Sequence, residues 1–395
     1  MPSSFASHWS LDPEIVFLNH GSYGACPNRV LAHQHQLRQR IERQPVQFFM
    51  RDGFGLLDEA RECLADFVGA RAQDLVFLRN TTEGVNAVVR SLDFAAGDQI
   101  IVTNHGYNAC RNIVEYVASK TGAEVVVVDL PFVGITEEQV IDTVTRAVTN
   151  KTRLAIIDHI TSPTGLVLPI APLTAALQDA GVPVLVDGAH GPGMVSLDMT
   201  QLSASWYVGN LHKWVCAPKG AAFMWMNSNV QTRTRPAIIS HGYNLRALMP
   251  ERPGHHLEFD WIGTHDPTAW LSVPAAIEFT ANIFPRGWSA VMKRNRALVL
   301  EARELIARRL KLEQPVTDSM IGHLAALPIR IENDTLSPLY GSAFQKRLLD
   351  KYKIEVPVIP WPDSNARLIR VSAALHNSIE DYAKLADALE KEQLC

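Results

Sequence analysis

The sequence predicts an α/β fold, in which a mostly parallel sheet with helices on both faces is followed by a smaller α+β part. Short β-rich runs alternate with helix-length segments over residues 74–226. Most of these runs are apolar throughout, which is typical of strands covered on both faces. The alternation ends near residue 260, where another pattern begins. Alternating strands and helices favour a doubly wound layer structure.

The main sheet is expected to have seven strands, because seven β-rich runs occur in this part of the chain. They cover residues 74–80, 99–104, 124–129, 153–160, 183–188, 205–210 and 221–226. The helices expected between the earlier strands cover residues 83–92, 107–119, 136–148 and 172–180.

The last third of the chain is expected to form a smaller domain. Its pattern predicts one long amphipathic helix over residues 274–309. Strands are then expected at 327–333, 353–359 and 367–373, and helices near 342–352 and from Ser378 onward. A helix near residues 28–43 belongs to an N-terminal arm. The expected division is an arm over residues 1–45, a large domain over 46–260 and a small domain over 261–395.

The composition is that of a globular protein and argues against two classes of partner. Hydrophobic residues make up 47% and charged residues 20% of the 395 residues, and the formal net charge is −4. A duplex-binding surface normally carries a basic excess, so we expect no nucleic-acid partner. The apolar stretches fall short of the ~20 residues that span a bilayer, so we expect no membrane partner.

The cysteines and histidines argue against disulfides and metals. The five cysteines are scattered, odd in number and without CxxC spacing, as is usual in a reducing compartment. The N-terminal residues do not have the pattern of a signal peptide. The 14 histidines include no HExxH or comparable spacing, so no metal site is expected. We therefore expect a cytoplasmic protein.

Three segments that follow strands carry residues suited to chemistry. Asn80-Thr81-Thr82-Glu83-Gly84 opens a helix, where free N–H groups and hydroxyls suit a phosphate, although the same pattern is a common capping box. Asp187 ends an apolar strand and needs a partner, such as a helix cap, a metal or a cationic ring nitrogen. Lys213 follows another apolar strand; it is either a desolvated nucleophile or a surface lysine.

Together these three features meet the needs of pyridoxal phosphate. A helix start holds the phosphate, a carboxylate keeps the pyridine nitrogen protonated, and an amine forms a Schiff base. Lys213 lies 26 residues beyond Asp187, with an intervening strand that brings it to the same edge of the sheet.

From FLNHGSYG at 17–24 to RVSAALHN at 370–377, the chain resembles the aminotransferase class V family of fold-type I pyridoxal-phosphate enzymes, and within it the isopenicillin N epimerase-like group. The resemblance implies that Lys213 of the HK motif is the Schiff-base lysine and that Asp187 pairs with the pyridine nitrogen. It places Thr81, Thr82, Asn210 and His212 at the phosphate and His190 at the ring oxygen. His105 matches the histidine that stacks on the cofactor and counts with Lys213 as catalytic; Tyr107 is the alternative stacker.

The resemblance also indicates how substrate binds and how subunits assemble. Arg370 matches the arginine that binds the substrate carboxylate, and Asn19 contacts the same end of the substrate. Gly263-Thr264 resembles the element that reaches the phosphate of a neighbouring subunit. The expected partners are therefore a small amino-acid substrate and a second copy of the chain, in a homodimer with shared active sites.

Two departures from the family pattern bear on function. His376-Asn377 stands where the family usually has Tyr-Asn, so no role is carried over from that tyrosine. The loop 357–366, which follows KIEV and precedes Arg370, contains no cysteine to accept sulfur as a persulfide, and Cys395 lies at the far C-terminus. A persulfide-forming desulfurase is therefore not expected.

The sequence leaves the reaction open among steps that begin at an amino-acid Cα–H. Epimerisation and β-elimination with C–S lysis are the main possibilities, and transamination is the alternative. An epimerase needs a second acid opposite Lys213, for which His241, Tyr243 and Tyr107 are candidates. A non-catalytic pyridoxal-phosphate-binding domain is a further alternative, disfavoured by the complete set of catalytic residues.

Overall fold

The computed structural model describes residues 3–331, 334–335, 342–363 and 366–392. Its main sheet has seven strands in the order β2-β8-β7-β6-β5-β3-β4. β8 is antiparallel to both neighbours and the other pairs are parallel, which confirms the predicted mostly parallel sheet. The strands are β2 (Leu75–Leu78), β3 (Gln99–Thr103), β4 (Glu124–Val128), β5 (Thr152–Asp158), β6 (Val184–Asp187), β7 (Trp206–Asn210) and β8 (Ala222–Met226).

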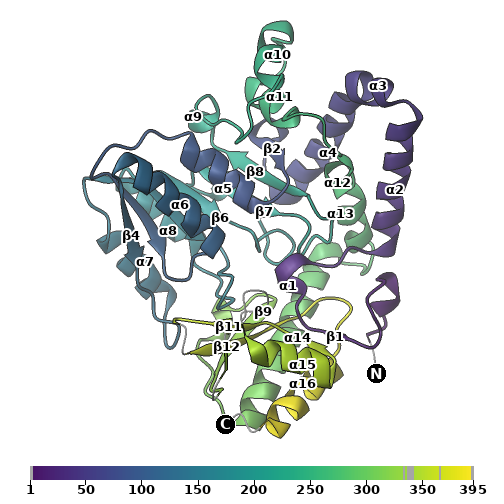
Figure 1. Ribbon diagram of the computed structural model, residues 1–395, viewed down its shortest axis with the longest axis vertical. Coiled ribbons are helices and arrows are strands. Elements are labelled where there is room, and N and C mark those ends of the chain that lie inside the picture. The colour runs from purple at the N-terminus through teal and green to yellow at the C-terminus, as the bar shows by residue number, and fades with distance from the viewer. Residues whose placement is uncertain (1–2, 332–333, 336–341, 364–365, 393–395) are drawn as a thin grey trace.

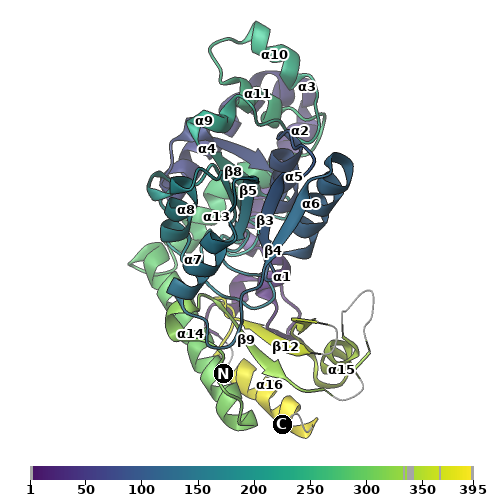
Figure 2. The same cartoon turned by 90° about the vertical axis from the view of Figure 1, so that its left-hand side faces the viewer.

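Helices cover both faces of this sheet, as Figure 2 shows. One face carries α5 (Thr81–Arg90) and α6 (Asn108–Thr121), and the other carries α7 (Glu137–Arg146) and α8 (Ile170–Asp179). Successive residues of β2 pack into different hydrophobic clusters: Leu75 and Phe77 into one, Val76 and Leu78 into the other. Two-sided burial accounts for the uninterrupted apolar strands.

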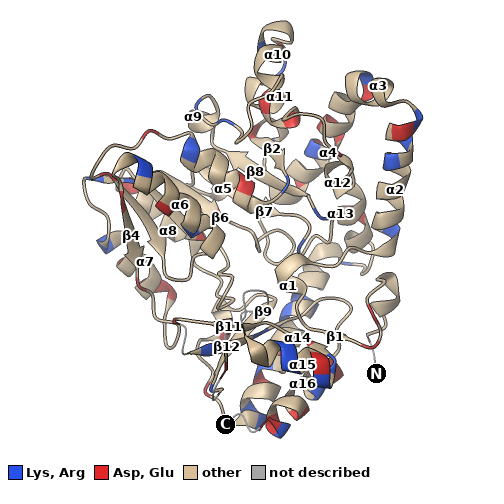
Figure 3. Cartoon of the chain, viewed as in Figure 1, with Lys and Arg blue, Asp and Glu red and all other residues tan. Residues whose placement is uncertain are grey.

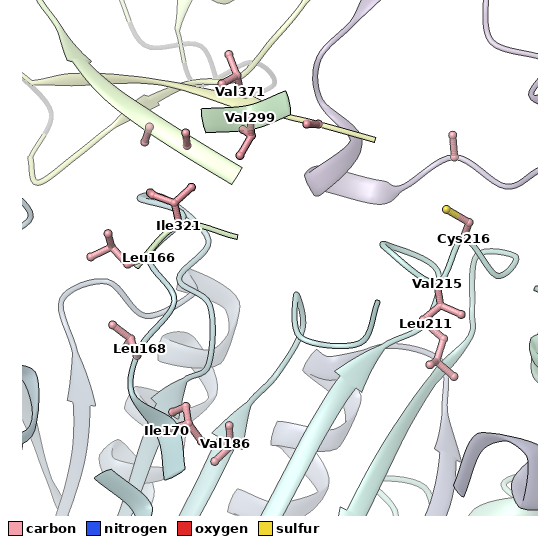
Figure 4. Packing of buried hydrophobic residues seen from close by; sticks show 14 of the residues in the cluster. Leu166, Leu168, Ile170, Val186, Leu211, Val215, Cys216, Val299, Ile321 and Val371 are labelled. Carbon is pink, nitrogen blue, oxygen red and sulfur yellow. The ribbon is translucent and has the colours of Figure 1, made fainter. Parts of the chain in front are cut away.

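The C-terminal part forms a three-stranded antiparallel sheet in the order β11-β12-β9. Its strands are β9 (Leu324–Ile329), β11 (Val358–Pro360) and β12 (Arg367–Ser372). α14 (Gly287–Leu310) and α16 (Ile379–Lys391) pack against each other here, and Figure 2 shows α15 (Ala343–Tyr352) on the side of this part away from α14. The hydrophobic cluster that includes Leu166 and Leu168 of the main part also includes Ile321 and Val371 of this part (Figure 4).

The structure corrects two of the predicted elements. The single helix over 274–309 is wrong: α13 (Val273–Ala281) and α14 are separate, because Pro285 lacks an N–H and its ring blocks a continuous helix. The strand predicted over 353–359 is divided into β10 (Ile354–Glu355) and β11. Residues 332–333 of the predicted strand 327–333 lie outside the described residues.

The remaining helices lie in the N-terminal arm and in the segment between the two sheets. The arm helix α2 (Asn28–Arg43) has the predicted bounds. The sequence analysis did not anticipate α3 (Pro45–Gln47), α4 (Gly53–Val68), α9 (Ser228–Gln231), α10 (Gly242–Leu248), α11 (Gly254–Asp260) or α12 (Thr268–Leu271). The domain boundaries at residues 45 and 260 remain a prediction.

Figure 3 shows acidic and basic residues intermingled along the helices. None of the helices within the described ranges is long and apolar enough to cross a membrane. The four cysteines in these ranges, Cys26, Cys63, Cys110 and Cys216, are free thiols.

A short N-terminal segment lies between the two parts of the molecule. β1 (Val16–Phe17) pairs in parallel with β10, and α1 (His20–Tyr23) then lies near the centre of the molecule (Figure 1). α1 ends at Gly24, whose φ is +69°. A Cβ on Gly24 would lie 2.0 Å from the carbonyl oxygen of His212, so only glycine allows this approach to the Lys213 loop.

Gly24→Ala is expected to destabilise the protein more than Gly181→Ala does. Gly181 has a similar φ of +74° but has no neighbour within 4 Å of an added Cβ, so its substitution adds backbone strain alone, about 1–2 kcal/mol. At Gly24 the clash with His212 adds about 1–3 kcal/mol. Urea unfolding of both variants measures the difference, and equal losses would show that α1 does not pack tightly on this loop.

Candidate active site

The Lys213 amine lies beside His190, whose own hydrogen bond to Trp214 indicates the protonation state of the amine. Its Nζ is 3.1 Å from Nε2 of His190, and Nε1 of Trp214 is 3.2 Å from Nδ1 of the same histidine. An indole N–H only donates, so Nδ1 of His190 accepts and Nε2 of the neutral ring carries the proton. His190 therefore donates to Lys213, and this geometry requires an unprotonated amine.

The electrostatics agree with this assignment. Burial, followed by the positive charge of Arg370, lowers the pKa of Lys213 to about 7, although Asp187 acts in the opposite direction. Burial and the nearby Lys213 hold the pKa of His190 well below its usual value, so its ring is neutral. A large fraction of Lys213 is consequently a free-base nucleophile near neutral pH.

Two buried carboxyl groups lie side by side at the ends of neighbouring strands. Asp158 ends β5 and Asp187 ends β6, and the two residues are directly paired in the sheet. The Asp187 oxygens accept hydrogen bonds from the backbone N–H of Ala189 at 3.0 Å and from Sγ of Cys110 at 3.1 Å. No Lys or Arg in the described ranges forms an ion pair with either carboxyl.

Burial raises the pKa of both carboxyls, and the charge of Asp187 raises that of Asp158 further. They line one small cavity together with Gly106, Tyr107 and Cys110. A protonated ring nitrogen is a cation of the right kind to balance a carboxylate in such a cavity.

The start of α5 has the features of an anion site. Oδ1 of Asn210 accepts from the backbone N–H of Thr81 at 3.0 Å, which joins the end of β7 to the helix start. Oδ1 of Asn80 accepts from the N–H of Glu83 at 2.9 Å, so a cap is also present. The hydroxyl of Thr81 is nevertheless buried with no hydrogen-bond partner, and Thr82 beside it is partly exposed. The hydroxyls of Thr81 and Thr82, at the start of a helix, are donors that suit a phosphate.

His212 lies in the loop that joins β7 to Lys213. Its Nδ1 is 3.2 Å from the carbonyl oxygen of Ala221, to which it donates. Burial, followed by the charge of Lys213, lowers the pKa of His212 to about 4, so the ring is neutral at physiological pH.

His105 and Tyr107 occupy different surroundings. Both ring nitrogens of His105 are engaged, Nδ1 with Oγ1 of Thr164 at 2.7 Å and Nε2 with the carbonyl of Leu130 at 2.9 Å. Trp361 packs against the ring with centroids 4.6 Å apart. Tyr107 lines the cavity of Asp158 and Asp187, whereas His105 is not among its lining residues. The geometry therefore favours Tyr107 over His105 as the residue facing the cofactor.

Arg370 is a buried cation without an acidic partner among the described residues. Its side chain donates to the carbonyl and the hydroxyl of Ser162 and, at 3.3 Å, to Oγ of Ser22. Its Nε is buried and unpaired. Burial lowers its pKa to about 10, which leaves the group charged at neutral pH. Among the described residues, Arg370 therefore forms no ion pair with an acidic side chain. A buried cation of this kind suits an anionic ligand.

Asn19 is linked to Arg370 through the side chain of Ser22. Its Oδ1 accepts from Oγ of Ser22 at 2.5 Å, and its Nδ2 donates to Glu355 at 3.0 Å. Ser22 therefore connects Asn19 to Arg370.

Other predicted residues lie away from Lys213 in this chain. Thr264 is exposed, and its role toward a neighbouring subunit remains a prediction. His241 and Tyr243 are exposed on or beside α10, which protrudes at the end of the molecule opposite the C-terminal sheet (Figure 1). Of the three candidates for a second acid, only Tyr107 reaches the cavity. Cys395 lies outside the described residues.

Several residues of the site escaped the sequence analysis. Asp158 and Ser162 lie at and just after the end of β5, and Trp214 follows Lys213. Reading every residue after each strand would have flagged Asp158. His20 and Ser22 sit in α1, far from any strand end of the main sheet, and only folding brings them to the site.

Comparisons with known proteins identify the family and the fold. The sequence model of the aminotransferase class V family matches residues 34–323. Isopenicillin N epimerase of Amycolatopsis lactamdurans is 33% identical over 97% of this chain and 96% of its own length. A probable chloroplastic L-cysteine desulfhydrase of Arabidopsis thaliana is 30% identical over 98% of this chain and 84% of its own. The cystine C–S lyase C-DES, solved with its reaction product cysteine persulfide, has a TM-score of 0.79 at 20% identity, covering 95% of this chain and 97% of C-DES.

Fold and site together define an enzyme of the fold-type I class, with its lysine at the carboxyl edge of a mostly parallel sheet. The chain belongs to the aminotransferase class V family. This membership confirms the family, the fold type and the dependence on pyridoxal phosphate that the sequence indicates. The likeness to C-DES supports the fold alone.

Proposed function

We propose that this protein is a pyridoxal-phosphate-dependent enzyme that acts on the Cα–H of an amino acid or amino-acid conjugate, by epimerisation or by β-elimination with C–S lysis. One observation carries the proposal: an unprotonated lysine amine and a buried arginine without an acidic partner face the same site. An α-amino acid offers its carboxylate to Arg370 and its Cα proton to Lys213.

The residues of the site fit the cofactor. Thr81, with a buried hydroxyl that lacks a partner, and its neighbours Thr82, Asn210 and His212 would hold the phosphate. Asp187 would hold the ring nitrogen, His190 the ring oxygen, and Lys213 the aldehyde carbon. When bound, pyridoxal phosphate supplies an electron sink that makes the Cα–H of an amino acid acidic.

The side chains of the site would bind the substrate and transfer its Cα proton. Arg370 binds the substrate carboxylate with a fork of donors, and Asn19 and Ser22 orient that end. Lys213, unprotonated near neutral pH, takes the Cα proton at Nζ. Tyr107 is 48% exposed, and partial burial raises the pKa of its hydroxyl. The hydroxyl is therefore protonated near neutral pH and is able to donate its proton to Cα. Epimerisation requires such a donor opposite Lys213.

Relatives support both outcomes. The relative from Amycolatopsis lactamdurans is an epimerase, and the Arabidopsis thaliana relative is a probable desulfhydrase. Transamination is the alternative for the same site, because it shares the removal of the Cα proton. A purely cofactor-binding role would not explain a buried arginine that has no acidic partner among the described residues.

Trapping the cofactor tests the assignment of the lysine. Borohydride reduction of the holoenzyme, followed by peptide mapping, should leave the pyridoxyl group on Lys213 and none in Lys213→Ala. A label on Lys219 would contradict the proposal. A panel of D- and L-amino acids and S-conjugated cysteines, assayed for pyruvate, ammonia and stereochemistry, then identifies the reaction; release of neither product with no stereochemical change would argue for transamination or binding alone.

Arg370→Ala is expected to weaken substrate binding at least tenfold while cofactor stays bound, because charge-assisted bonds contribute ~1.5–3 kcal/mol each. Arg370→Lys should restore only part of the loss, since a point charge lacks the paired donors of a guanidinium. The measurement is kcat/KM for an amino acid and its carboxamide with each protein. An unchanged preference for the free carboxylate in Arg370→Ala would exclude Arg370 as the anchor.

The homodimer with shared sites and the cytoplasmic location are part of this proposal. The exposure of Thr264 is consistent with a role in a neighbouring subunit, and the free thiols suit a reducing compartment. Mixing Lys213→Ala with Thr264→Ala protein should partly restore cofactor retention, because one hybrid site then has both residues intact. A stable, active monomer in sedimentation would contradict the shared site.

A further inference from the structure

Two buried histidines connect three distant segments around Lys213. His20 lies in α1, and its Nε2 is 3.0 Å from the carbonyl oxygen of Lys213. Nδ1 of His20 is 3.2 Å from Nε2 of His376, which follows β12. His20 is 0% exposed and His376 7% exposed, so water does not replace these contacts.

The carbonyl fixes the direction of both hydrogen bonds. A carbonyl oxygen only accepts, so Nε2 of His20 donates to Lys213. Burial lowers the pKa of His20 to about 4, and the ring is therefore neutral with an accepting Nδ1. Nε2 of His376 consequently donates to His20, and the two rings form a chain that ends on the backbone of Lys213.

The same short helix also reaches the substrate end of the site. Ser22, two residues after His20, accepts from Arg370 at 3.3 Å. The backbone N–H of His20 donates to Oγ of Ser372 at 2.8 Å, which ties α1 to the strand that bears Arg370. α1 thus spans the distance between the carboxylate-binding group and the amine.

We propose that His20 and His376 are positioning residues, which hold the backbone of Lys213 so that its amine stays against His190 and in register with Arg370. The inference rests on the proposed function. It assigns a role to His376, at which this chain departs from the tyrosine of its family. Neither histidine contacts the reacting atoms; both act through the Lys213 backbone.

His376→Phe tests the pair, because phenylalanine fills the space but cannot donate to His20. His376→Gln is the conservative variant, since its amide places a donor near the position of Nε2. His256→Phe is the matched control: His256 is a 5% exposed histidine with one hydrogen bond, from Nε2 to the carbonyl of Gln73 at 3.1 Å, and it lies on α11.

The expected result for His376→Phe is a fall in kcat of about tenfold or more with KM changed by less than about threefold, because misplacing a reacting group affects the chemical step. In protein stripped of cofactor, competitive acylation should show the pKa of Lys213 raised from about 7, as a less constrained amine becomes better hydrated. His376→Gln should recover most of both properties. His256→Phe should change thermal stability alone.

Equal kcat and Lys213 pKa in His376→Phe, His256→Phe and the unmodified protein would reduce the pair to a structural contact and overturn the proposal. Equal impairment of His376→Gln and His376→Phe would overturn the donor role. Failure of the proposed function is distinguished by the unmodified protein, which would then show no borohydride label and no turnover, whereas the acylation measurement still reports on the pair.

Discussion

The site depends on two basic side chains removed from water, the buried Arg370 and the partly buried Lys213, neither of which has a carboxylate partner within salt-bridge distance among the described residues. When water is removed, a guanidinium stays protonated at neutral pH because its pKa is very high, whereas an ammonium loses its proton more readily. The pKa of Lys213 accordingly falls to about 7 while that of Arg370 stays near 10. The Lys213 amine is therefore largely neutral near pH 7 while Arg370 remains a cation, and the proposed binding of an α-amino acid rests on this difference.

The fold makes this arrangement by collecting chain-distant residues at one sheet edge. Asp158 and Asp187 end adjacent parallel strands, and Asn210 ends the next strand and binds the start of α5. Parallel order therefore places the carboxyls, the start of α5 and the lysine loop at the same edge of the sheet.

Much of the fold and the residue types of the site were predictable, because the strands are apolar on both faces and the chemistry follows their ends. The break at Pro285 was missed because the amphipathic pattern continues across it. His105 and Tyr107 are two residues apart, and sequence alone does not reveal that Thr164 and Leu130 occupy both nitrogens of the histidine. The contacts of the α1 residues could not be predicted for another reason. Their partners are 193 residues away in the sequence for His20 and 348 for Ser22.

The segment after β12 explains how one local departure from the family pattern is accommodated. Asn377 has a backbone role, since its Nδ2 donates to the carbonyl of Phe17 and its Oδ1 accepts from the N–H of Ala374. His376, the preceding residue, does not make these backbone contacts, and its side chain contacts His20 instead. Because a histidine here meets a histidine in α1, the two positions are coupled through one hydrogen bond. A change at either is therefore transmitted to the Lys213 carbonyl, while the Asn377 contacts that hold the N-terminal segment are left intact.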